Sequence, residues 1–210
     1  MGEKTIGNFV RKVCNALWDQ LVEEQFPFPT EESWRAISEG FKNTVHFPNC
    51  FGSVDGKYVR VLKYTSSGSM NLNYKYFFSV VLMAVVDSNY RFVYIDVGAY
   101  GKYCDSSVFQ RTNFYRMLTD GRLNVPQPAL IQEGSDVKLP FVLVEDQAFI
   151  LTDKVQRPYK GHFLSDTKII FNYRCVGHGD LLRAHLAFGI LSNKRRIFHR
   201  LLNVTKPLAK

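Results

Sequence analysis

Acidic residues are absent from the end of this chain: residues 181–210 contain no Asp or Glu. The same stretch carries Arg183, a Lys194–Arg196 basic run, Arg200, Lys206 and Lys210, and the formal net charge of the whole chain is +8. A one-sided basic end suits a polyanion such as nucleic acid. A solvated helix face followed by a frayed tail explains the charge equally well.

Features of several other protein classes are also missing. The cysteines at 14, 50, 104 and 175 are too far apart in sequence to form a Cys-x-x-Cys zinc knuckle. No signal peptide is recognisable, and no apolar run reaches the roughly 20 residues that span a bilayer. We therefore expect a reduced, intracellular protein with structural thiols and no membrane partner. The 210 residues, 46% of them hydrophobic, are enough for one domain with a substantial core.

The N-terminal part predicts two helices. Apolar residues recur at helical spacing over residues 6–26, and residues 27–30 interrupt the pattern with two prolines. Thr30 is placed to cap a second helix, with Glu31 and Glu32 in its first turn. Packing of these helices on a core accounts for their pattern without any further function.

Strands follow from Phe51 onward. The predicted strands are rich in β-branched and aromatic residues and cover residues 51–62, 77–87, 91–100 and 141–145. The turn between the second and third is Asp87-Ser88-Asn89. Between and after them we expect a helix at 105–118, a polar loop at 120–139 and a last helix at 179–202. This order predicts an α/β fold: an RNase H-like mixed sheet of three antiparallel strands and then β-α units, preceded by a helical segment.

Three aspartates stand where these elements begin or end, and each has an ordinary explanation. Asp55 with Gly56 is a hairpin-turn signal, and Asp105 is a good helix N-cap. Asp146 can make local loop hydrogen bonds, or it can be a ligand at the carboxyl end of a strand. From these residues alone the turn and the cap are favoured, and the two explanations of Asp146 are even. Phosphodiester cleavage by two metal ions does, however, need carboxylates from separate elements.

Several strings, taken in order, resemble the DDE endonuclease domain of PIF/Harbinger transposases and their domesticated relatives. The resemblance runs from Phe47 to Phe198, and its strings are FPNCFGSVDGKYV, NYKYFFSVVLMAVVDSNYRFVYIDVGAYGKYCDSSVF, LVEDQAF, RPY, IFNYR and AFGIL. It divides the chain into an N-terminal helical segment at 1–46 and a nuclease domain at 47–205. Ordered agreement over many segments is far more specific than any single short motif.

The resemblance implies a set of functional residues. Asp55, Asp105 and Asp146 match acidic ligands for a divalent metal cation, Mg²⁺ or Mn²⁺. The final Glu of the family, which stands just before an x-Ala-Phe-Gly string, is His185 in this sequence. The implied catalytic set is therefore Asp55, Asp105, Asp146 and His185.

Three positions depart from the family pattern: His185 replaces Glu, Glu145 replaces Gly, and Arg195 replaces a Trp. Neutral imidazole at position 185 removes negative charge from the site, and it suits Zn²⁺ or Mn²⁺ better than Mg²⁺. The sequence thus predicts a transposase-derived, metal-dependent DNA endonuclease domain impaired at His185. The alternative is a domesticated, inactive domain that binds nucleic acid or protein. A small-molecule hydrolase with His185 as base ranks far below both, because no Ser or Cys motif supports it.

The resemblance also implies partners and a location. We expect DNA as a partner, a separate Myb-like DNA-binding protein as a second, and a nuclear protein that is also compatible with the cytoplasm. Full-length members of the family usually carry more chain before the nuclease core, including a helical DNA-recognition part. The sequence is accordingly expected to be a fragment or to have lost recognition of transposon ends.

Overall fold

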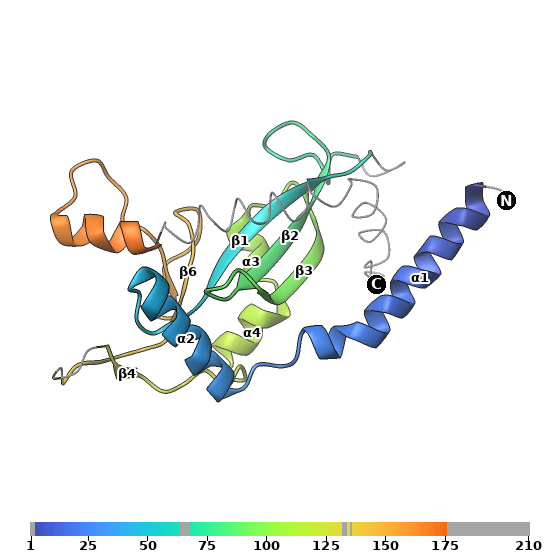
Figure 1. The fold of residues 1–210 in the computed structure, drawn as a ribbon. Coiled ribbons are helices and arrows are strands. Elements are labelled where there is room, and N and C mark those ends of the chain that lie inside the picture. The colour runs from blue at the N-terminus through green and yellow to red at the C-terminus, as the bar shows by residue number, and fades with distance from the viewer. Residues whose placement is uncertain (1–2, 64–67, 132–133, 135, 176–210) are drawn as a thin grey trace.

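A five-stranded mixed sheet forms the centre of the molecule, as seen in a computed structural model that describes residues 3–63, 68–131, 134 and 136–175 (Figure 1). Its strand order is β3-β2-β1-β6-β7. The strands are β1 (Cys50–Arg60), β2 (Ser79–Val86), β3 (Phe92–Tyr100), β6 (Val142–Val144) and β7 (Val155–Gln156). A separate two-stranded ribbon pairs β4 (Ala129–Leu130) with β5 (Lys138–Leu139). The arrangement is consistent with the predicted RNase H-like fold.

The first three strands form the predicted antiparallel meander. Strand β2 is buried along its whole length, as expected for a continuous apolar run in the middle of a sheet. The turn before β3 is held by Asp87, whose Oδ1 accepts hydrogen bonds from the backbone N–H groups of Asn89 and Arg91, each at 2.8 Å. Strand β6 then lies parallel to β1, which confirms the expected strand reached through a helix.

The helices agree with the sequence in part. They are α1 (Glu3–Gln25), α2 (Glu31–Val45), α3 (Asp105–Phe109) and α4 (Asn113–Thr119), and residues 166–175 are also helical. Thr30 caps α2 as predicted, since its Oγ1 accepts from the Ser33 N–H at 3.2 Å. The single helix predicted at 105–118 is wrong: Thr112 starts a new helix there by accepting from the Tyr115 N–H at 3.1 Å.

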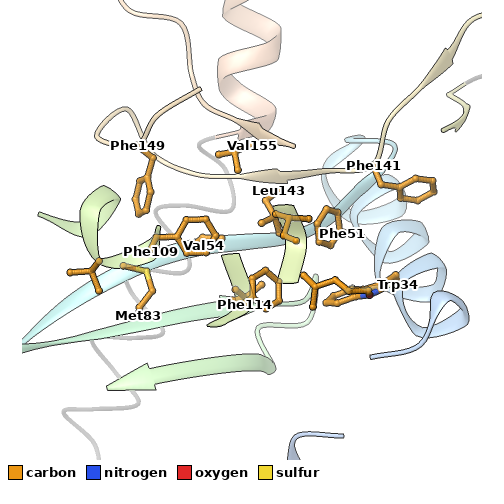
Figure 2. Packing of buried hydrophobic residues seen from close by; sticks show 14 of the residues in the cluster. Trp34, Phe51, Val54, Met83, Phe109, Phe114, Phe141, Leu143, Phe149 and Val155 are labelled. Atoms are coloured by element: carbon orange, nitrogen blue, oxygen red, sulfur yellow. The ribbon is translucent and has the colours of Figure 1, made fainter. Parts of the chain in front are cut away.

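The main hydrophobic core lies between the sheet and the helices α2, α3 and α4 (Figure 2). Side chains from separate elements meet in it, namely Trp34, Phe51, Val54, Met83, Phe109, Phe114 and Leu143. The indole N–H of Trp34 donates to the Leu123 carbonyl at 2.7 Å, so its polar atom is satisfied inside the core. This packing fixes the start of α3 against the sheet.

Some predictions concern residues that the structure does not describe. The helix predicted at 179–202, His185 and the basic end all lie outside them. The loop predicted at 120–139 contains the β4–β5 ribbon, and the helix at 166–175 was not expected. None of the described helices is both long enough and apolar enough to cross a membrane.

Candidate functional site

Asp55 lies within β1 and not in a turn, so the hairpin explanation of its Asp-Gly pair is wrong. It stands opposite Ala84 of β2, and only 7% of the residue is exposed. Its Oδ1 accepts a hydrogen bond from the Gly56 N–H at 2.8 Å. Because side chains alternate along a strand, the carboxylate is on the sheet face that carries Ala84 and Leu82.

Asp146 lies two residues after the end of β6, the strand that neighbours β1. The parallel register pairs Ser53 with Val144, so Asp55 and Asp146 each stand two residues beyond this last pair. The half-buried Asp146 accepts the Ala148 N–H at 2.8 Å through its Oδ1. The sequence predicted these two aspartates on adjacent strands with their carboxylates facing one another. Asp55 lies on β1 and Asp146 just beyond the neighbouring β6, the facing of their carboxylates stays a prediction, and the local loop hydrogen bond of Asp146 is present.

Asp105 is the first residue of α3, and the N-cap position belongs to Cys104, which makes no side-chain capping bond. The cap explanation of Asp105 is therefore wrong. Its carboxyl group lies against the backbone of Gly56: a Cβ placed on Gly56 would be 2.5 Å from Asp105 Cγ. Only glycine leaves room for this approach, which brings Asp105 beside the residue that follows Asp55.

The three aspartates thus surround one short stretch of β1, at the point where its pairing with β6 stops. Asp105 approaches Gly56 from the core face, whereas Asp55 extends from the other face of the strand. Within the described residues, no three His, Cys, Asp or Glu side chains are grouped closely enough to hold a metal ion. His185, the fourth predicted residue, lies outside the described part of the chain.

Glu145, noted in the sequence only as a departure from the family, is a buried carboxyl beside Asp146. It is 5% exposed, and its Oε1 finds no hydrogen-bond partner among the described residues. Burial above all, and then the neighbouring Asp146, raise the pKa of Glu145 to about 9. In the metal-free chain Glu145 is therefore protonated at neutral pH and carries no negative charge. Side chains two residues apart in a strand point to the same face, so Glu145 points inward like the buried Leu143.

An aromatic connection leads from Asp105 to the surface. The Tyr58 hydroxyl donates to the Tyr103 carbonyl at 2.8 Å, and the Tyr58 ring lies 5.6 Å from that of Tyr74. Burial and then the nearby Asp105 raise the pKa of Tyr58 above its usual value. The hydroxyl stays neutral, and Tyr58 acts as a fixed link between the acidic residues and the exposed Tyr74.

Cations cover this aromatic surface. The Arg111 guanidinium is 4.4 Å and the Lys102 ammonium 5.1 Å from the centre of the Tyr103 ring. On Tyr74, which is 69% exposed, the Lys75 ammonium is 5.3 Å from the ring centre. We call these residues the cation–aromatic strip: Tyr74, Lys75, Lys102, Tyr103 and Arg111.

The Asn73 side chain stabilises the turn that carries Tyr74 and Lys75. The buried Asn73 side chain accepts from the Lys75 N–H at 2.9 Å and the Phe77 N–H at 3.2 Å, and it donates to Ser79 Oγ at 3.0 Å. The tip of the turn is thereby ordered before any ligand arrives. Sequence analysis missed the strip, because its members come from two loops far apart in the chain.

Comparison with known proteins shows the family of the chain. The family described as "DDE superfamily endonuclease" matches residues 54–202, a range that includes all three aspartates and His185. The chain belongs to this DDE endonuclease family. No solved structure matches it.

A curated relative adds to this assignment. "Protein ALP1-like" of Arabidopsis thaliana is 25% identical over 204 residues, which are 95% of this chain and 48% of the relative. This chain therefore spans about half the length of the curated relative it matches.

Proposed function

We propose that this DDE domain binds a divalent cation and DNA, and that His185 leaves it impaired as an endonuclease. The observation that carries the proposal is the placement of the acidic residues. Asp55 of β1 and Asp146, two residues beyond the parallel β6, lie at the same level, and Asp105 packs against Gly56 beside them. Ligands gather at the carboxyl ends of parallel strands in open α/β sheets.

The donor set fits a hard cation. Carboxylate oxygens are the ligands preferred by Mg²⁺ and also suit Mn²⁺, and Gly56 leaves the space that Asp105 occupies. Asp55 and Asp146 would hold the cation, and Asp105, which approaches Gly56 from the other face of β1, would add negative charge that attracts it. The cation would supply the positive charge that stabilises a phosphate under attack. Catalytic contacts often tighten only when ligands arrive, so the absence of a closed cluster among the described residues is compatible with this assignment.

The protein itself contributes orientation. The Gly56 and Ala148 N–H groups fix one oxygen of Asp55 and one of Asp146, respectively. Burial of Asp55 also limits the access of water to its carboxylate. Two carboxylates are thus partly oriented by the backbone, which lowers the cost of arranging them around an ion.

DNA contacts are assigned to the cation–aromatic strip. Lys75, Lys102 and Arg111 are exposed, and cations at such positions bind phosphates. The exposed Tyr74 ring beside Lys75 can stack on a base of single-stranded or distorted DNA. Tyr103 is two residues from Asp105, so a strand bound on the strip lies next to the acidic residues. A nuclear location and a Myb-like partner belong to the same proposal and rest on the family resemblance.

Impairment follows from His185. Where the family has a fourth carboxylate, this chain has an imidazole, and the protonated Glu145 does not restore the charge. The alternative is a domain that binds nucleic acid or protein without cutting. The cation–aromatic strip favours this alternative too, because its contacts with DNA need no metal ion.

Calorimetric titration with Mn²⁺ tests the cation site without requiring activity. We expect the unmodified chain to bind Mn²⁺, and Asp55→Asn, Asp105→Asn and Asp146→Asn each to weaken binding by about tenfold or more. Asp153→Asn, which changes an exposed carboxylate outside the cluster, is the control and should leave affinity unchanged. Absence of Mn²⁺ binding at millimolar concentration, or equal losses in Asp153→Asn, would reject the site.

A further inference from the structure

Helix α1 presents an apolar surface that is exposed in the described part of the structure and that lies outside the candidate site. Its large apolar side chains recur at spacings of three and four residues, which places them along one side of the helix. Phe9 is 63% exposed and Leu17 is 54% exposed. We call the exposed set the α1 stripe: Ile6, Phe9, Val13, Leu17 and Leu21.

Among the residues that the structure describes, α1 packs against the sheet and α4 through its C-terminal end. The Trp18 and Phe26 rings are 6.4 Å apart, and with Val22 they line a cavity of about 230 Å³ against β3 and α4. The remainder of α1 extends away from the sheet (Figure 1). An amphipathic helix gains most of its stability from packing its apolar face, so α1 as described lacks its main source of stability.

The charges of α1 indicate what covers the stripe. Residues 3–14 contain the cations Lys4, Arg11 and Lys12 and a single anion, whereas residues 15–25 contain Asp19, Glu23 and Glu24 and no cation. Two copies of the helix in antiparallel orientation bring each basic half beside the acidic half of the other, and their dipoles oppose. In parallel orientation like charges and like dipole ends would face each other.

We propose that α1 is a dimerisation helix, which pairs antiparallel with α1 of a second copy of this chain through the α1 stripe. Such a two-fold contact is isologous, since the same surface is used on both copies. Cys14, half-buried, stands near the midpoint between Ile6 and Leu21. The two Cys14 thiols of the dimer therefore lie close to the two-fold axis. The two Ile6 side chains lie about 24 Å apart, at 1.5 Å per residue.

Sedimentation equilibrium tests the pairing. We expect a dimer for the unmodified chain and an increase of about 100-fold or more in its dissociation constant for Leu17→Glu, because two unpaired charges would enter the interface. Asn15→Glu adds the same charge at an exposed position on the other side of α1, and it should leave the dimer intact. A monomeric unmodified chain, or an assembly that survives Leu17→Glu, would overturn the proposal.

Cross-linking with a short bismaleimide tests the orientation. In a Cys104→Ser background, Cys14 is the one of the three remaining cysteines that is not buried, and it should give a covalent dimer. When Cys14→Ser is added and Ile6→Cys introduced, antiparallel pairing predicts no cross-link. An efficient cross-link at position 6 would show parallel pairing and contradict the proposed arrangement, as would failure of Cys14 to cross-link in a dimeric sample.

Discussion

Two parts of β1, only a few residues apart, have neighbouring side chains of opposite charge. Around Asp55 the neighbours are carboxyl groups, from Asp146 on the next strand and Asp105 on α3. From Tyr58 onward the neighbours are tyrosine rings covered by lysine and arginine. In the proposed function a cation binds in the first region and a phosphate in the second. The difference between the two regions then predicts that DNA binding and cutting depend on separate side chains and can be lost separately.

The largest effect is expected in the cation–aromatic strip. A triple variant with Lys75→Ala, Lys102→Ala and Arg111→Ala should bind DNA roughly 100-fold more weakly at about 0.1 M salt. The slope of log affinity against log salt concentration should become less steep by about three. The variant lacks three phosphate contacts, so binding no longer releases the counterions of those phosphates. Fluorescence anisotropy with labelled oligonucleotides over a salt series measures both quantities.

Three cations outside the strip provide the matched control. Arg35, Lys42 and Arg122 are exposed, and each already pairs with a nearby carboxylate, at 2.7, 3.4 and 2.8 Å respectively. Changing all three to Ala removes the same formal charge and should alter DNA affinity far less. If the two triple variants lose affinity equally, net charge and not the strip governs binding.

Glu145 is the carboxyl group beside Asp146 whose pKa is raised by burial. Its pKa is about 9 in the folded chain and 4.5 in the reference state, so between these values only the unfolded chain loses the proton. Stability should therefore fall as pH rises through this window, by up to about 1.4 kcal/mol per pH unit. Glu145→Gln should remove this dependence and be the more stable protein by about 3 kcal/mol near pH 7.

Urea unfolding at several pH values, with a chelator present to exclude metal ions, measures this prediction. Asp153→Asn serves as the control, and it should keep the pH dependence of the unmodified chain. Parallel pH profiles for the unmodified chain and Glu145→Gln would mean that Glu145 is ionised in the fold. The acidic region would then carry more charge than we assign to it.

Gly56→Ala tests how closely Asp105 must approach β1. The added Cβ would overlap the Asp105 carboxyl group and displace it, so Mn²⁺ affinity should drop by about tenfold. The loss in free energy of unfolding should stay within about 1–3 kcal/mol, because the Asp105 side chain can move away. Gly7→Ala, where a Cβ meets no atom within 4 Å, should leave the affinity unchanged. Unaltered Mn²⁺ binding by Gly56→Ala would remove Asp105 from the site.

Sequence patterns predicted the central strands well because long runs of β-branched residues dominate over local signals. The neighbouring positions of Asp55 and Asp146 followed from the strand order and from the family resemblance. Short elements were harder: the two-residue strand β7 has too few residues for a recognisable period. The break at Thr112 carried a usable signal, a capping threonine before Asn113, but the apolar residues on both sides suggested one helix.

Surface and burial features depended on contacts distant in the chain. The cation–aromatic strip joins residues 74–75 to residues 102–111, and no local pattern links them. The exposure of the α1 stripe was also not predicted from the sequence. An amphipathic period predicts an apolar face, but it does not say which element covers that face. Alternation in the 141–145 run predicts that the Glu145 side chain points inward. A glutamate after four apolar residues, however, suggests the end of a buried strand.

Plasmid nicking by the unmodified chain and by His185→Glu tests the central claim most directly. Supercoiled DNA is incubated with Mg²⁺ and, separately, with Mn²⁺, and the nicked product is followed with time. We predict little or no cutting by the unmodified chain in Mg²⁺ and nicking at least tenfold faster by His185→Glu, since about 1.4 kcal/mol of recovered transition-state stabilisation is enough for that factor. Equal rates for the two proteins in Mg²⁺ would contradict the account, because His185 would then not limit catalysis.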